Sequence, residues 1–197
     1  MTKIPRMLFI KLVTISITLI VVGSALLYLT KHNNQDTITA ITGNEIANQI
    51  ALNWSENATL VHVHPIGDNI VNGYSNGWGF AYWNGLNENN SELLISIWTH
   101  KEPYTRLTNR SPDELPIYDW NVDSDKAYNI AMKNEKIKSF MTHSPTLDSF
   151  FLASPAPTGN SVWYIYWSYN AGIDDPKWAQ IQIDANTGEV LYVDVDT

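Results

Sequence analysis

Residues 178–194 read Trp178-Ala-Gln-Ile-Gln-Ile-Asp-Ala-Asn-Thr-Gly-Glu-Val-Leu-Tyr-Val-Asp194, and this stretch decides the fold that we expect. From residue 179 to residue 184, apolar and polar side chains alternate strictly, which predicts a β-strand with one buried and one solvent-facing side. Residues 185–188 are typical of a tight turn, and Gly188 can adopt a positive φ. Residues 189–194 resume as a strand, so the stretch predicts a β-hairpin.

The hairpin resembles the PepSY domain family, in which a strand ends in Asp-Ala-x-Thr-Gly-Glu-Val after a helix rich in Ala and Ile. The helix candidate here is residues 125–134, and the resemblance covers roughly residues 124–197. It implies a small α+β module, usually outside the cytoplasm and often tethered to a membrane. Such modules bind or restrain peptidases or other partners without catalysis of their own. The matching residues are Ile181, Ile183, Asp184, Ala185, Thr187, Gly188, Glu189 and Val190.

The charge of the chain is strongly asymmetric. Residues 1–30 hold three of the 12 basic residues and none of the 20 acidic ones, so the remainder has 9 basic and 20 acidic residues, a net charge of −11. An acidic body argues against nucleic acid as a partner, because binding to phosphates needs a basic surface. The chain has no Cys, which excludes disulfides and thiolate chemistry.

The N-terminal segment predicts a membrane anchor. Residues 12–29 form an 18-residue run without a charge, close to the roughly 20 residues that cross a bilayer. Lys3, Arg6 and Lys11 precede the run, so we expect a single-pass anchor in the cell membrane over residues 1–32, with the body outside the cytoplasm. A cleaved signal peptide is the alternative, since Gly23-Ser-Ala25 is a candidate cleavage site.

The first half of the body predicts one helix followed by strands. Thr42 and Glu45 have the spacing of a capping box, and apolar residues recur every four positions over a helix at about 44–55. Strands are expected at 59–65, 77–83 and 92–99, separated by Asn-Gly turns.

The second half repeats this order. Residues 47–52 resemble 127–132 at an offset of 80, and residues 94–97 resemble 180–183 at an offset of 86. The fold class that we expect is therefore α+β, with an N-terminal transmembrane helix and two modules that each contain a helix and an antiparallel sheet. The boundaries are 1–32 for the anchor, 33–42 for a tether, 43–110 for a first, degenerate PepSY-like module, 111–122 for a linker and 123–197 for the second module.

Two histidines are the weak candidates for a metal site. His62 and His64 lie two residues apart in an expected strand, so both imidazoles point to one side, about 7 Å apart. Such a pair can begin a zinc or copper site, to which His100 and His143 could contribute. Structural histidines are the alternative interpretation.

The carboxylates do not indicate catalysis. Asn121, Asp123 and Asp125 mimic the start of a calcium loop, but Lys126 stands where such a loop needs Gly, and helix capping explains them better. Asp174 and Asp175 belong to an expected turn. The motifs of zinc peptidases, serine hydrolases, and phosphate- or dinucleotide-binding sites are absent, so we expect neither an enzyme nor a cofactor.

Aromatic strands supply the candidate binding surface. In residues 163–167 the side chains alternate, with Tyr164 and Tyr166 on one face and Trp163, Ile165 and Trp167 on the other. Tyr and Trp are enriched where proteins bind partners. The candidate partner-binding residues are Tyr164, Tyr166, Trp83, Trp163 and Trp167.

These observations favour a non-catalytic, membrane-anchored, extracytoplasmic protein that binds a protein or peptide partner, such as a peptidase that it regulates. Two alternatives stay open. One is a metal-dependent hydrolase or metal-binding protein that uses His62 and His64, and the other is a structural subunit of the cell envelope.

Overall fold

The computed structural model describes residues 37–67, 70–85, 91–155, 159–170, 172 and 175–196. All of these residues belong to one compact unit, Thr37–Thr197. The expected anchor over residues 12–29 therefore lies outside the described residues, as does the start of the tether. Within the described ranges, no helix is both long enough and apolar enough to cross a bilayer.

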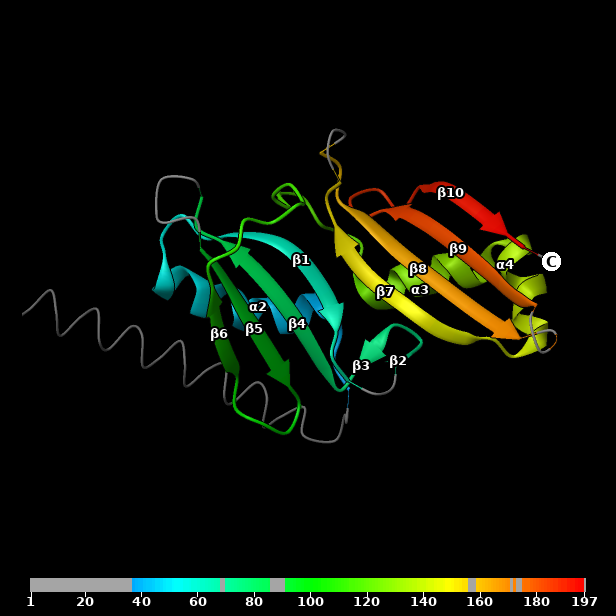
Figure 1. Ribbon diagram of the computed structural model, residues 1–197, viewed down its shortest axis with the longest axis horizontal. Helices are drawn as coiled ribbons and strands as arrows, with labels where there is room; N and C mark the ends of the chain where they lie inside the picture. Colours follow the sequence, from blue (N-terminus) through cyan, green and yellow to red (C-terminus); the bar gives the residue numbers. More distant parts are fainter. Residues whose placement is uncertain are drawn as a thin grey trace, which may run out of the picture. The chain divides into compact units, whose positions relative to one another are not determined.

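The body is α+β, as predicted, and is built on one large antiparallel sheet (Figure 1). The strand order in this sheet is β10-β9-β8-β7-β1-β4-β5-β6. The strands are β1 Thr59–Pro65, β4 Gly77–Trp83, β5 Glu92–Trp98, β6 Tyr104–Thr108, β7 Thr146–Ala153, β8 Val162–Asn170, β9 Pro176–Asp184 and β10 Val190–Val195. A separate small hairpin pairs β2 Ile70–Val71 with β3 Tyr74–Ser75.

The helices lie together on one face of the sheet (Figure 1). They are α2 Ala40–Trp54, α3 Ser124–Lys133 and α4 Glu135–Phe140, followed by the 3-10 turn η1 Met141–His143. Alternation along the strands directs the apolar side chains toward these helices, and Ile181 and Ile183 of β9 are fully buried. Trp78 and Trp163 meet edge to face, with ring centroids 6.3 Å apart, so the core is continuous between the two halves.

The order of one helical segment followed by four strands of the large sheet occurs twice. The two groups share a single sheet, in which β1 and β7 meet at the centre. Their register contains only two residue pairs, His62 with Ala153 and Val63 with Leu152. Residues 109–122 cross between the groups without helix or strand.

The predicted start of the first helix was wrong. The helix begins at Ala40, with Thr39 as its N-cap, so Thr42 lies inside the helix. The amide of Ile41 donates to Asp123 Oδ1 at 2.9 Å, and the amide of Ala40 donates to Ser124 Oγ at 3.0 Å. Residues more than 80 positions away thus accept the hydrogen bonds of the amides in the first turn. No local capping motif can reveal such partners.

The same contact region joins the small hairpin to α3. Gly73 has φ of 82°, and a Cβ atom there would lie 2.3 Å from the Ser124 carbonyl oxygen. Only glycine allows this approach. The Tyr74 hydroxyl also donates to Asp125 Oδ2 at 3.2 Å. The helix N-termini and the hairpin therefore hold the two halves together on the helix side of the sheet.

The predicted C-terminal hairpin is present as β9 and β10, which pair antiparallel. Its turn is closed by Asp184, whose carboxylate accepts from the amides of Asn186 and Thr187 at 2.9 and 2.8 Å. Gly188 has φ of 80°, and a Cβ atom there would lie 3.1 Å from Ile130 Cδ1 of α3. Gly188 thus has a positive φ and also packs against helix α3.

Replacing Gly188 with Val should lower the free energy of unfolding by about 1–3 kcal/mol, because a β-branched residue is strained at positive φ. Gln182→Ala, on the helix-free face of β9, is the control and should change stability little. Urea denaturation of both variants measures the difference. Equal unfolding midpoints would contradict the assigned turn.

Candidate functional site

The side of the sheet opposite the helices carries no secondary structure of its own in the part of the chain that the structure describes (Figure 1). Alternation places Tyr164 and Tyr166 of β8 on this helix-free face, opposite Gln182 and Gln180 of β9. Both tyrosines are half-buried. They are therefore accessible in part.

Three aromatic side chains form a stacked row across the centre of the helix-free face. The ring of His62 on β1 lies 5.4 Å from that of Phe151 on β7, with 17° between their planes. The Phe151 ring lies 4.8 Å from that of Tyr164 on β8, at 12°. We call His62, Phe151 and Tyr164 the aromatic row. It crosses the junction between the two halves.

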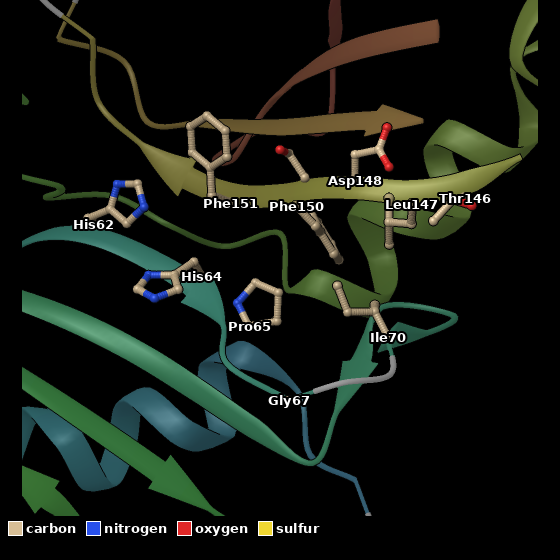
Figure 2. Close-up of a pocket in the computed structure, with 11 residues that line it drawn as sticks. His62, His64, Pro65, Gly67, Ile70, Thr146, Leu147, Asp148, Phe150 and Phe151 are labelled. Carbon is tan, nitrogen blue, oxygen red and sulfur yellow. The ribbon is translucent and has the colours of Figure 1, made fainter. Parts of the chain in front are cut away.

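Beside the aromatic row, β1 and β7 diverge and leave a pocket of about 520 Å³ (Figure 2). The pairing of the two strands ends at Val63 and Leu152. Two residues further along β1 stands Pro65, which has no N–H to donate to a neighbouring strand. The pocket is lined from β1 by His62, His64 and Pro65, from β7 by residues 146–151, and from the segment that leads into β2 by Gly67 and Ile70. The edge of β7 thus faces a pocket where a neighbouring strand would otherwise lie.

Both histidines belong to the pocket wall, and their ring centroids are 5.3 Å apart. The His64 ring lies against β4, where a Cβ atom on Gly79 would be 2.8 Å from it, so the glycine makes room for the imidazole. Burial lowers the pKa of His64 to about 4, and the neighbouring His62 adds to the shift. His64 is therefore uncharged at neutral pH.

His62 has a carboxylate beside it. Its Nδ1 atom lies 3.4 Å from Glu114 Oε1 of the linker, within ion-pair range but without the alignment of a hydrogen bond. Burial lowers the pKa of His62, although Glu114 opposes the shift. The Nδ1 atoms of both histidines are buried and have no hydrogen-bond partner among the described residues.

The described residues include no group of three or more His, Asp, Glu or Cys side chains arranged to hold a metal ion. His100 follows β5, and His143 stacks on Tyr169 with ring centroids 4.9 Å apart. Besides the two imidazoles, the pocket wall carries the polar side chains of Thr146, Asp148 and Ser149 from β7, and the aromatic row lies beside it.

Two predicted binding residues need correction. Trp163 and Trp167 are 0% and 1% exposed, because they occupy the helix-facing side of β8, and the Trp163 indole donates to the Val122 carbonyl at 2.7 Å. They form the core and are not available to a partner. Trp83 is half-buried at the end of β4.

The carboxylates singled out in the sequence have structural partners. Asp123 is the N-cap of α3, and Asp175 forms an ion pair with Lys177 at 3.2 Å. Asp174 lies outside the described residues.

Strand β7, which carries Phe151 and the second wall of the pocket, was not predicted from the sequence. The internal repeat contained the necessary signal. An offset of about 85 from the first strand of the first half, residues 59–65, points to residues 144–150, close to the observed Thr146–Ala153. The contact of His62 with Glu114 depends on the path of the linker, and no local pattern predicts that path.

No protein-family model matches this chain, and no curated protein is similar to it. One similar solved structure is the crystal structure of a protein described as a "putative lipoprotein" from Clostridium difficile 630. The TM-score is 0.46 and the sequence identity 14%, and the match covers 83% of this chain and 97% of the other.

Acid should destabilise the body through His64. A histidine whose pKa is lower in the folded than in the unfolded chain stabilises the fold fully above its ordinary value of 6.5. That stability is lost as the pH falls from 6.5 toward 4, on the order of 2 kcal/mol. His64→Phe keeps a ring and removes the titration, so its melting temperature should depend less on pH over this range. His143→Phe is the control, and a pH dependence unchanged in His64→Phe would contradict the assignment.

Proposed function

We propose that this chain is a membrane-anchored, extracytoplasmic and non-catalytic binding protein that captures an extended segment of a protein partner. The observation that carries the proposal is the aromatic row, which lies across β1, β7 and β8 beside the pocket. The tandem PepSY-like organisation and the uncharged run at residues 12–29 support it from the sequence. A peptidase, or the pro-segment of one, is the kind of partner that the resemblance implies.

The mode of binding follows from the pocket. A β-strand presents backbone N–H and C=O groups along its edge, and an extended peptide can pair with such an edge. Along residues 146–151 the edge of β7 faces the pocket instead of a pairing strand of the described chain. A peptide strand entering here pairs with β7, and its alternate side chains contact the aromatic row. Backbone pairing supplies affinity, and the side-chain contacts supply selectivity.

A second candidate function is metal binding by His62 and His64. The observation in its favour is that both Nδ1 atoms are buried without a hydrogen-bond partner in the described part of the chain. Zinc or copper that binds the purified full-length chain in stoichiometric amounts, and is lost in His62→Ala, would favour this function over peptide capture.

The test of peptide capture is photo-cross-linking in intact cells. A photoreactive phenylalanine analogue at position 164 of the full-length chain should cross-link to a partner protein, because Tyr164 ends the aromatic row. The same analogue at position 118 is the control, since the Tyr118 side chain is 77% exposed but lies in the linker. Adding Phe151→Ala should reduce the cross-link at position 164 at least tenfold, the scale of one binding hot spot.

Equal cross-linking at positions 164 and 118, or no effect of Phe151→Ala on a chain that still folds, would overturn the proposal. Circular dichroism separates loss of binding from loss of fold, because Phe151→Ala removes a half-buried side chain from the helix-free face and leaves the core intact.

A further inference from the structure

The two outermost strands of the sheet carry an unusual share of exposed apolar surface. Of the nine large hydrophobic side chains that are exposed in the described part of the chain, five lie on β6 and β10. Neither strand has a partner on its outer side within the described residues. Isolated proteins usually protect such edges with charge or a covering segment. The five are Tyr104, Leu107, Val190, Leu191 and Tyr192.

The two edges have opposite charge. Residues 37–100 contain no Lys or Arg, whereas residues 101–110 contain Lys101, Arg106 and Arg110 and only one acid. Residues 189–196, which include β10, contain three acids and no base. Arg106 has no carboxylate partner in the part of the chain that the structure describes. The β6 edge thus holds an unpaired cation, and the β10 edge is anionic.

The topology matches the two edges to each other. All neighbouring strands of the large sheet are antiparallel, and their number is eight. Because the number of strands is even, the strands at the two ends of the sheet, β10 and β6, run in opposite directions. A second copy in the same orientation therefore brings its β10 antiparallel to β6 of the first, and the helices of both copies stay on one face of a continuous sheet.

Side-chain direction is compatible with this contact. Arg106 lies opposite Leu94 and Asp194 lies opposite Gln180, both on the helix-free face. Leu107 pairs with Leu93, and Val193 pairs with Ile181, both on the helix side. If Arg106 faces Asp194 of the next copy, Leu107 faces Val193, so the charged and the apolar pairs form in one register.

We propose that β6 of one copy pairs with β10 of a second copy, with Arg106 opposite Asp194, so that copies of this chain extend a common sheet. Pairing of like edges is disfavoured, because two β10 strands would oppose acids and two β6 strands would oppose cations. The contact is heterologous, so assembly continues beyond a dimer. The inference is independent of partner capture, because the aromatic row lies at the centre of the sheet and the contact lies at its edges.

The chain has no cysteine, so cross-linking can test the contact directly in the full-length protein. Two differently tagged copies, one with Arg106→Cys and the other with Asp194→Cys, are co-expressed and oxidised. Cα atoms opposed in an antiparallel pair lie about 4.5–5.5 Å apart, within disulfide range. The expected result is a mixed-tag dimer, and a chain with both substitutions should give a ladder of higher oligomers. Tyr118→Cys with Asp194→Cys measures random collision.

A charge swap distinguishes specific pairing of β6 with β10 from chance contact between crowded copies in the membrane. Arg106→Asp should reduce mixed-tag cross-linking several-fold when measured between Leu107→Cys and Val193→Cys, and adding Asp194→Arg to the same chains should restore it. Dimers that form only between two Arg106→Cys copies, or mixed-tag dimers no more abundant than the Tyr118→Cys control, would overturn the proposal.

Discussion

The carboxylate of Asp123 accepts hydrogen bonds from the first turns of two helices in this molecule. The Oδ1 atom of Asp123 accepts from the amide of Ser124 at 2.7 Å, at the start of α3, and from the amide of Ile41 at 2.9 Å, at the start of α2. The first amides of a helix have no partner within it and carry a partial positive charge. Two such termini repel each other unless an anion lies between them. Asp123 is that anion, and it lies where the two halves of the body meet.

The arrangement of the proposed binding surface depends on where the two halves are in close contact and where they separate. On the helix side, the shared cap and the close approach of Gly73 to Ser124 hold the halves together. In the sheet, β1 and β7 share two residue pairs and then diverge. The divergence exposes the edge of β7 and opens the pocket beside His62 and His64. The halves are thus held together on the helix side, while β1 and β7 separate within the sheet. The proposed binding of an extended segment uses the space between these two strands.

The local patterns in the sequence predicted the strands that are bounded by turn residues or that alternate clearly. The strands at 59–65 and 77–83 and the C-terminal hairpin agree with the structure, because Asn-Gly turns bound the first two and buried positions alternate along β9. The same alternation places Tyr164 and Trp163 on opposite faces of β8, and only one of these faces can be open to a partner because the other packs on the helices. Strand β7 was missed because Asp148 and Ser149 interrupt its alternation at a bulge. The start of α2 and the contact of His62 with Glu114 depend on residues far apart in the chain, which no local pattern contains.

The shared cap can be tested by hydrogen exchange at the Ile41 amide. This amide lies in the first turn of α2, has no partner within its own helix and is protected by Asp123, 82 positions away. In Asp123→Ala, exchange at Ile41 should accelerate to that of an exposed helix terminus. In Asn134→Ala, which removes the cap of α4 alone, Ile41 should exchange as in the natural chain. Unchanged protection of Ile41 in Asp123→Ala would contradict the account that one carboxylate joins the two halves.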